Sequence, residues 1–529
     1  MQKLVKNYIE DILEKEVVLE KPKDITLGHF ATPVAFSLAK ELRKSPMIIA
    51  EELASKFDES IIFEKVEAVK GFINFKLSNG FLEQLSKEAL QLGNDFGKCE
   101  KRDQSILLEY VSANPTGPLH IGHARGAVLG DSIARVGRHL GFDITTEYYV
   151  NDAGAQMDML GLSISLAGRD LILKETVEYP EKYYRGDYLV DIAQQIFEKH
   201  GAEIFHDESR FREMAEFGKD IVMNIIISDL KDVGIEFDNF VSEASLYDAW
   251  LDTKKVLLDN GSLYEKDEKI FLKSTLHGDD NDRVVVRENG IPTYLAGDII
   301  YHKNKFDRAY DHYINIWGAD HHGYIKRVHA AVEFLGNDSS KLEILLSQMV
   351  QLLKGGEPYK MSKRAGNVIL MSDIAEEIGS DTLRFVFLTK KSDTHLEFDL
   401  DMLKNQDSSN PIFYINYAYA RINQVFKKSE KSFESVLNEN YENLNQDGLN
   451  LVYESLLMPS VLEEAFAKRD MQKITDYLYS LASSVHRFYN EHKIVGSDDE
   501  NKYLKVLSLC ALTINVTLGL LGIKAKEVM

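Results

Sequence analysis

The chain has 529 residues, of which 44% are hydrophobic and 28% charged, so it is not a disordered, collagen-like or disulfide-stapled protein. Its formal net charge of −22 argues against a protein that coats nucleic acid non-specifically, because an acidic surface repels phosphates. The two cysteines, Cys99 and Cys510, are too few for a disulfide framework and fit a reducing, cytoplasmic environment.

Residues 1–100 are expected to form an N-terminal α+β module. Helical spacing is seen over 1–19, 30–42 and 46–57, and the alternating stretch 66–77, rich in Val, Ile and Phe, predicts a pair of strands. The first 20 residues are charged throughout, so we expect no secretory leader. The polar stretch 97–104 is expected to end this module.

Residues 101–405 alternate between apolar runs and helical stretches. The pattern predicts a helix over 121–140 after the Pro/Gly turn 112–119, and buried strands over 106–111, 144–150, 313–317 and 344–352. Such alternation predicts an α/β fold: a doubly wound, Rossmann-like parallel sheet with its site at the carboxyl ends of the strands. The polar stretch of about 168–288 interrupts the pattern and is expected to be an insertion.

Residues 406–529 are expected to form an all-α helical bundle. Helical spacing extends over 412–426, 449–467, 471–491 and 502–521. The longest apolar run, 506–523, contains four polar residues, so we expect a buried bundle helix and no membrane span. Nothing in the sequence requires a homodimer, and a monomer is expected.

The tetrapeptide His120-Ile121-Gly122-His123 follows the Pro/Gly turn and opens the predicted helix. A helix N-terminus offers free N–H groups and partial positive charge to a phosphate, and Gly122 leaves room for a nucleotide against the backbone. The two histidines can donate to negative charge that develops on a phosphate. Taken alone, the tetrapeptide is equally compatible with two surface histidines in the first turn of a helix.

A second motif, Lys360-Met361-Ser362-Lys363-Arg364, has glycines on both sides, at Gly355-Gly356 and Gly366. Two lysines on such a loop can close over a polyphosphate leaving group. An isolated basic pentapeptide is more often a solvated loop. Together, however, the two motifs in their predicted contexts resemble the HIGH and KMSKS motifs of class I aminoacyl-tRNA synthetases.

That resemblance implies two reaction steps. An amino-acid carboxylate attacks the α-phosphate of ATP and pyrophosphate leaves; the aminoacyl group then passes to the 3′ end of tRNA. It also implies four catalytic residues, His120, His123, Lys360 and Lys363. The ATP site that it implies comprises Pro115, Gly117, His120, Gly122, His123, Gly318, Asp320, His321, Met349, Val350, Lys360, Met361, Ser362 and Lys363.

The amino acid is indicated by the wider sequence around the first motif. The stretch 109–126 (EYVSANPTGPLHIGHARG), together with 71–75 (GFINF) and 392–400 (SDTHLEFDL), resembles arginyl-tRNA synthetases. A guanidinium ligand needs planar carboxylate and carbonyl acceptors, which agrees with acidic residues at this place. By resemblance the arginine site comprises Glu109, Ser112, Asn114, His120, Tyr294, Asp298 and Asp320.

The segment Gly318-Ala-Asp320-His321-His322-Gly323 follows a predicted strand, so its polar side chains could reach the ATP ribose or the substrate ammonium group. No cysteine lies near it, and we expect no structural metal there. Mg²⁺ is expected to accompany ATP as the only ion.

The two ends of the chain are expected to bind tRNA(Arg). By resemblance, the N-terminal module, with Asn74 and Phe75, meets the D-loop corner, and the C-terminal bundle meets the anticodon. Tyr417 and Arg421 lie one helical turn apart, so they could stack on and pair with unstacked bases. The family places its C-terminal residue, here Met529, nearby.

Three other functions remain open. A class I synthetase for an apolar amino acid is disfavoured by Glu109 and Asp298 in the binding site, because burying unpaired carboxylates costs free energy. A tRNA-binding paralogue without activity would not need both intact motifs. A nucleotidylyltransferase that makes adenylates without tRNA would have no use for the helical C-terminal third.

Overall fold

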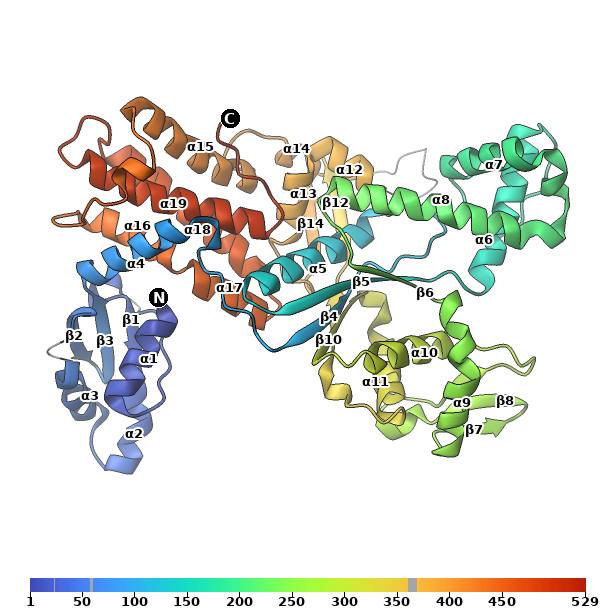
Figure 1. Ribbon diagram of the computed structural model, residues 1–529, viewed down its shortest axis with the longest axis horizontal. Coiled ribbons are helices and arrows are strands. Elements are labelled where there is room, and N and C mark those ends of the chain that lie inside the picture. Colours follow the sequence, from blue (N-terminus) through green and yellow to red (C-terminus); the bar gives the residue numbers. More distant parts are fainter. Residues whose placement is uncertain (23, 58–59, 360–368) are drawn as a thin grey trace. The chain divides into compact units, whose positions relative to one another are not determined.

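The computed structural model describes residues 1–22, 24–57, 60–359 and 369–529 (Figure 1). The chain divides into two compact units. One is continuous, Glu100–Asn405, and the other joins Met1–Cys99 with Gln406–Met529.

The continuous unit is built on a five-stranded sheet in the order β11-β10-β4-β5-β6. All neighbouring strands are parallel, which confirms the predicted parallel α/β fold. The strands are β4 (Ser105–Glu109), β5 (Asp143–Val150), β6 (Asn239–Ser242), β10 (His312–Gly318) and β11 (Leu342–Ser347).

Helices cover both faces of this sheet. Helix α5 (Ile121–His139) lies on one face, where Gly126 packs on Ile316 of β10. Helices α10 (Tyr294–Asp307) and α11 (Ile325–Phe334) lie on the other, where Leu107 of β4 and Tyr313 of β10 pack with Val328 and Val332. Side chains that alternate along each strand explain the division, because successive residues point to opposite faces.

Two expectations for this unit are wrong. The run 344–352 is not one strand: it ends at Ser347, and β12 (Val350–Lys354) belongs to a separate small sheet with β13 (Glu357–Pro358) and β14 (Leu396–Asp399). The polar range 168–288 is not one insertion either, because it contains β6, the edge strand of the central sheet. Strand β6 has two apolar residues, Phe240 and Val241, between polar ones, so no apolar run marked it in the sequence.

The remaining helices of the unit lie before and after these strands. They are α6 (Ala155–Ala167), α7 (Asp187–His200), α8 (Phe211–Asp232), α9 (Trp250–Asp259), α12 (Met371–Ile378), α13 (Ser380–Phe387) and α14 (Leu400–Leu403). In Figure 1, α6, α7 and α8 form a helical group at one end of the unit.

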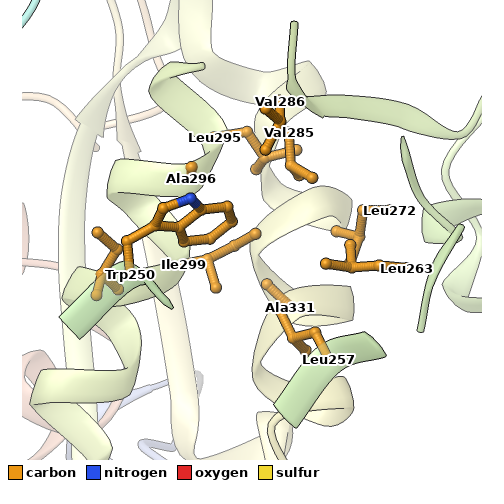
Figure 2. Packing of buried hydrophobic residues seen from close by; sticks show 11 residues of the cluster. Trp250, Leu257, Leu263, Leu272, Val285, Val286, Leu295, Ala296, Ile299 and Ala331 are labelled. Atoms are coloured by element: carbon orange, nitrogen blue, oxygen red, sulfur yellow. The ribbon is translucent and has the colours of Figure 1, made fainter. Parts of the chain in front are cut away.

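A hydrophobic cluster fixes helix α10 (Figure 2). Its first turns contribute Leu295, Ala296 and Ile299, which pack against Trp250 and Leu257 of α9. The small antiparallel sheet of β7 (Leu263–Lys266), β8 (Lys269–Leu272) and β9 (Arg283–Val286) closes the cluster. Apolar packing therefore holds the N-terminal turn of α10 on the side of the helix that faces away from the sheet.

Beneath α10 the sheet carries a buried polar row. Asn315, Glu109 and Glu147 are directly opposite one another on the neighbouring strands β10, β4 and β5. Lys305 of α10, itself fully buried, bonds the Glu109 carboxylate and the Asn315 side-chain oxygen.

Arg308, the residue that follows α10, donates two hydrogen bonds to the Glu147 carboxylate, at 2.5 and 2.9 Å. The Tyr301 hydroxyl donates to the same carboxylate at 2.8 Å. A buried charge is tolerated only when it is paired and hydrogen-bonded, so these contacts fix the helix against the sheet.

The second unit begins with a small antiparallel sheet in the order β1-β3-β2. Its strands are β1 (Phe30–Thr32), β2 (Phe63–Val69) and β3 (Phe72–Leu77), and its helices are α1 (Gln2–Leu13), α2 (Val34–Leu42), α3 (Pro46–Ala54) and α4 (Asn79–Leu92). The strand pair expected over 66–77 is confirmed. The helix expected from residue 30 is wrong over its first turn, because Phe30–Thr32 pairs with β3 and the helix begins at Val34, after Pro33.

The C-terminal part of this unit is a helical bundle, as expected. Its helices are α15 (Pro411–Ser429), α16 (Gln446–Leu456), α17 (Met458–Ala467), α18 (Gln472–Glu491) and α19 (Glu500–Leu520). The helix expected over 449–467 is two helices, with Pro459 in the first turn of the second. Helix α19 is the one described helix that is long and apolar enough to span a membrane, and 78% of its apolar window is buried in the bundle.

The polar row yields a stability prediction. Lys305→Met leaves the Glu109 carboxylate buried without its cation, so the free energy of unfolding is expected to fall by about 3–5 kcal/mol. Urea unfolding followed by tryptophan fluorescence measures it, since both tryptophans, Trp250 and Trp317, lie in this unit. The control Lys303→Met breaks only a partly exposed pair with Asp307 and is expected to cost under about 1 kcal/mol. Equal losses in the two variants would contradict the assignment.

Candidate active site

The histidine motif lies at the N-terminus of α5, at the carboxyl edge of the central strands. His120 is the N-cap, and its Nδ1 accepts a hydrogen bond from the Gly122 amide at 3.1 Å. The His120 and His123 rings stack with centroids 3.7 Å apart. Burial lowers the pKa of both rings, that of His123 to about 3 with a further contribution from His120. Both imidazoles are therefore neutral at pH 7 and can donate through a ring N–H.

The turn before the motif is strained. Val111 and Ser112 both have positive φ angles, 67° and 42°, which non-glycine residues rarely adopt. The Ser112 hydroxyl donates to Glu109 at 2.9 Å and accepts from the Tyr149 amide at 3.1 Å, which holds this conformation. Asn114 next along the turn is exposed, Pro115 is buried and Gly117 lies against the Tyr188 hydroxyl.

The lysine motif, Lys360, Met361, Ser362 and Lys363, lies outside the described residues. Its C-terminal flank is described and lies beside the histidine motif. The Ile121 amide donates to the Ile369 carbonyl at 2.9 Å, and the Met371 amide donates to the Leu119 carbonyl at 2.9 Å. Main-chain bonds thus join the flank of the second motif to the first turn of α5.

The other predicted nucleotide residues follow neighbouring strands of the sheet. Gly318 ends β10, and Asp320 and His321 lie in the 3₁₀ turn Ala319–Tyr324 after it, with exposed side chains. Met349 is 73% exposed and Val350 starts β12. The side chains of Asp320, His321 and Met349 are open to solvent at the carboxyl edge, where the fold predicts the ligand, and Val350 is half-buried.

Tyr294 and Asp298 lie one turn apart at the start of α10, as predicted from their spacing. Tyr294 is 49% exposed, and its ring lies against Gly154. Burial, together with the negative charges of Glu243 and Glu109, raises the pKa of the Asp298 carboxyl to about 7, against a hydrogen bond from Tyr324. Among the described residues no cation pairs with Asp298.

The Glu109 side chain has a different environment from the other residues predicted to bind arginine. Its carboxylate faces α10, where it bonds the buried Lys305 ammonium and accepts from Ser112. Lys305 was missed by sequence analysis, because it lies 196 residues from Glu109 in the chain. Its only signal was its position seven residues after Asp298 in the same helix.

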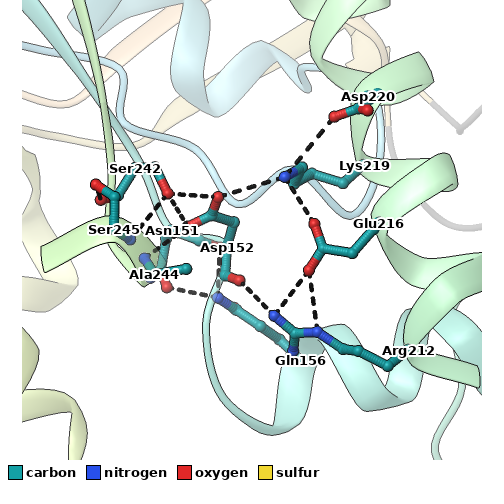
Figure 3. A network of polar contacts seen from close by, with 10 residues as sticks. All are labelled: Asn151, Asp152, Gln156, Arg212, Glu216, Lys219, Asp220, Ser242, Ala244 and Ser245. Carbon is teal, nitrogen blue, oxygen red and sulfur yellow. Dashed lines mark hydrogen bonds and ion pairs between the residues drawn. The ribbon is translucent and has the colours of Figure 1, made fainter. Parts of the chain in front are cut away.

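Two further acidic residues at this edge were missed with β6. Asp152, which follows β5, accepts from the Ser242 hydroxyl at 2.8 Å and the Ala244 amide at 2.9 Å (Figure 3). Lys219 of α8 lies 3.5 Å from the same carboxylate, so α8 is tied to the sheet edge. Glu243, directly after β6, is buried.

No metal group is formed by Asp320, His321 and His322 in the part of the chain that the structure describes. The group of potential ligands found there, Asp447, Glu491 and His492, lies in the helical bundle.

The predicted tRNA residues divide into two kinds. Tyr417 and Arg421 of α15 are together at the bundle surface: the Arg421 guanidinium lies over the Tyr417 ring, 4.6 Å from its centroid, and donates to its hydroxyl at 3.0 Å. Met529 is 43% exposed. Phe75, by contrast, is fully buried against Phe57 and Phe63, and Asn74 is 3% exposed. A direct contact of Phe75 with RNA is therefore corrected: it is a core residue of the small sheet.

Comparisons with known proteins agree with this geometry. Three family models match: the arginyl tRNA synthetase N-terminal domain over 1–77, the class I (R) tRNA synthetase catalytic domain over 85–426, and the DALR anticodon binding domain over 415–529. An arginine–tRNA ligase of Aliarcobacter butzleri (strain RM4018) is 72% identical over the whole of both chains.

Solved structures are similar as well. A crystal structure from Campylobacter jejuni, 56% identical, covers 86% of this chain and 100% of its own with a TM-score of 0.83. The arginyl-tRNA synthetase of Thermus thermophilus shares the fold at 19% identity, with a TM-score of 0.78 and full coverage of both chains.

A parallel sheet with the histidine motif at the N-terminus of α5 thus defines a class I aminoacyl-tRNA synthetase. Within that class the matches extend over nearly the whole chain. The chain belongs to the arginyl-tRNA synthetase family and is an aminoacyl-tRNA ligase specific for arginine.

The raised pKa of Asp298 generates a pH prediction. A carboxyl group with a pKa of about 7 is ionised above pH 7 and protonated below it, and only the ionised form attracts the arginine cation. The KM for arginine is therefore expected to fall several-fold between pH 6 and pH 8. The KM for ATP measured over the same range is the internal comparison. An arginine KM that does not change with pH would contradict the prediction.

Proposed function

We propose that this arginine–tRNA ligase forms arginyl-adenylate at the carboxyl edge of the central sheet, between the N-termini of α5 and α10, and transfers it to tRNA(Arg). The observation that carries the proposal is the position of the N-terminus of α5, at His120, on the same sheet edge as the first turn of α10, which carries the exposed Tyr294 ring and the Asp298 carboxyl.

The arginine pocket supplies charge and planar surfaces. Asp298 accepts from the guanidinium, and the exposed Tyr294 ring closes over it, because a guanidinium binds both carboxylates and aromatic faces. Asn114 also contacts the arginine side chain, Ser112 lines the site, and Asp320 reaches the substrate ammonium group, which leaves the substrate carboxylate near the histidine motif. Glu109 acts from below through its pair with Lys305.

In the first step a substrate carboxylate oxygen attacks the α-phosphorus of ATP, and the bond to the bridging oxygen of pyrophosphate breaks. His120 and His123, neutral before ATP binds, donate ring N–H groups to the α-phosphate oxygens as negative charge develops there. The free amides at the start of α5 add to this stabilisation. Lys360 and Lys363 hold the departing pyrophosphate. No protein nucleophile takes part, so catalysis is by positioning and charge.

In this proposal the nucleotide is held by residues that lie after the carboxyl ends of the strands. Gly122 lets the nucleotide approach the α5 backbone, and Pro115 and Gly117 shape the preceding turn. Gly318, His321, Met349, Val350, Met361 and Ser362 complete the site. Mg²⁺ would accompany ATP and neutralise part of its phosphate charge.

The second step places the 3′ end of tRNA(Arg) at the same edge. The bundle carries Tyr417, Arg421 and Met529 on its surface, and an arginine stacked on a tyrosine is suited to an unstacked anticodon base. The N-terminal module meets the corner of the tRNA through surface residues. The enzyme works as a monomer in the cytoplasm, without a membrane.

The decisive experiment is ATP–pyrophosphate exchange with arginine, lysine or glutamine, with and without tRNA. Exchange is expected with arginine alone among the three amino acids, because Asp298 selects a guanidinium. Exchange only in the presence of tRNA would indicate that tRNA completes the site, and exchange without it would indicate that the intact lysine motif suffices. An absence of exchange in both conditions would contradict the proposal.

The role of the lysine motif has its own test. Lys363→Ala removes a cation from the leaving pyrophosphate, so the kcat of exchange is expected to fall about 10²- to 10³-fold. Lys354→Ala is the control, since that lysine of β12 pairs with Glu377 on the surface. Full activity of Lys363→Ala would refute the assigned role.

A further inference from the structure

The turn 112–119, which leads into the histidine motif, is held by a tyrosine from outside the central sheet. Tyr188 is the second residue of α7, and its hydroxyl donates to the main-chain carbonyl of Thr116 at 2.7 Å, across 72 positions of the chain. Its ring also lies against Gly117, where a Cβ atom would come 3.2 Å from the Tyr188 hydroxyl oxygen. No role assigned so far uses this contact.

The turn has little main-chain bonding of its own. Among the residues that the structure describes, the main-chain hydrogen bonds within this stretch join residues only two positions apart. The Ser112 amide donates to the Tyr110 carbonyl at 3.0 Å, and the Thr116 amide to the Asn114 carbonyl at 2.8 Å. Val111 and Ser112 also have positive φ angles. A strained backbone keeps its conformation when the surrounding structure fixes it, so this turn depends on side chains from other elements.

Two tyrosine hydroxyls from different elements fix carbonyls of the turn. Tyr148 of β5 is fully buried and donates to the Ala113 carbonyl at 2.9 Å, so its position is set by the central sheet. Tyr188 is half-buried, and its position is set by α7. The turn is therefore held from two sides, and one of these sides is a group of helices that is separate from the sheet.

Packing within the group α6–α8 fixes the start of α7. Ile192 of α7 and Ile164 of α6 both reach Gly218 of α8, where the missing side chain lets the helices approach closely. The Tyr184 amide, just before α7, donates to the Ser163 hydroxyl of α6 at 2.9 Å. The Tyr188 ring therefore has a defined origin from which it reaches the turn.

The same group is anchored to the sheet at a second point. Lys219 of α8 lies 3.5 Å from the Asp152 carboxylate, and Arg212 of α8 donates to the Asp152 carbonyl at 3.2 Å (Figure 3). Asp152 follows β5, whereas the turn held by Tyr188 follows β4. The group α6–α8 thus connects the ends of two neighbouring strands at the edge where the histidine motif lies.

The segment before α7 adds a contact to the same residue of the turn. Tyr184 hydrogen-bonds the Thr116 side chain and is electrostatically coupled to Tyr294 of the proposed arginine site. Both the carbonyl and the side chain of Thr116 are therefore bonded by the helical group. Since His120 follows only four residues later, a displacement of Thr116 would change where α5 begins.

We propose that Tyr188 is a positioning residue for adenylate formation. Its hydroxyl acts through the Thr116 carbonyl: it fixes the turn, and the turn fixes how His120 and His123 approach the α-phosphate of ATP. The inference rests on the proposed function and makes the helical group α6–α8 a part of the machinery for the first step.

The first test is Tyr188→Phe in the full chain, which removes one oxygen atom and keeps the ring. The kcat of arginine-dependent ATP–pyrophosphate exchange, measured with tRNA present, is expected to fall about 10-fold, because the reacting groups remain but are less well placed. The KM values for arginine and ATP are expected to stay within about twofold. The melting temperature is expected to change by less than about 3 °C, because one partly exposed hydrogen bond is lost.

Tyr179→Phe is the matched control. Tyr179 belongs to the same helical group, but its hydroxyl donates to Asp170 at 2.7 Å on the surface of that group. The same atom is thus removed from a tyrosine that does not bond the turn, and the kcat of exchange is expected to equal that of the wild type.

A rescue experiment separates positioning from a general effect on the fold. Tyr188→para-aminophenylalanine returns an N–H donor to the place of the lost hydroxyl, so the bond to the Thr116 carbonyl can form again. The kcat of exchange is expected to recover to within about threefold of the wild type. A kcat that stays as low as in Tyr188→Phe would overturn the assigned role of the hydrogen bond.

The remaining outcomes distinguish the inference from the proposed function. Arginine-dependent exchange in the wild type, together with an unchanged kcat in Tyr188→Phe, would overturn the role of Tyr188 and leave the function intact. A fall in kcat of the same size in Tyr179→Phe would also overturn it, because the effect would not depend on the turn. No arginine-dependent exchange in the wild type would overturn the proposed function itself.

Discussion

The contact on which the catalytic unit depends is the buried ion pair between Lys305 of α10 and Glu109 of β4. It lies in a row with the Glu147–Arg308 pair, under a helix whose other side is packed against an apolar cluster. Buried charges of this kind restrict movement of α10, because a shift of the helix along the sheet would leave them without partners. The row therefore fixes how far the first turn of α10 projects, and with it the positions of Tyr294 and Asp298 at the sheet edge.

The buried polar row also explains how the arginine site can select a cation. Lys305 and Arg308 pair with two carboxylates of the sheet, whereas Asp298 at the start of α10 has no ion pair among the described residues. Unbalanced negative charge therefore lies beside the tyrosine rings of this region. A cation that enters relieves the repulsion there, whereas a neutral side chain of similar length does not.

Local patterns in the sequence predicted much of this architecture and less of the site. Strand β4, the turn after it and α5 with its two histidines are contiguous, so short apolar runs and a helix start were sufficient. Strand β6 has four residues in a polar neighbourhood and owes its place to pairing with β5, which no local pattern reveals. Missing β6 meant missing Glu243. The Lys305–Glu109 pair escaped for the same reason, since only the folded sheet brings the two together.

The bonds between the Ile121 amide and the Ile369 carbonyl, and between Met371 and Leu119, have an evolutionary consequence. They join the surroundings of two motifs that the sequence keeps far apart, and they use only main-chain atoms. The side chains at these four positions take no part in the two bonds, but Leu119, Ile121 and Met371 are buried, so apolar replacements of similar volume are the ones expected to be tolerated there. Insertions, deletions and prolines cannot be absorbed there in the same way, because they change the register or remove a donor. Heritable variation at this junction is thus limited by chain length and register as well as by apolar packing.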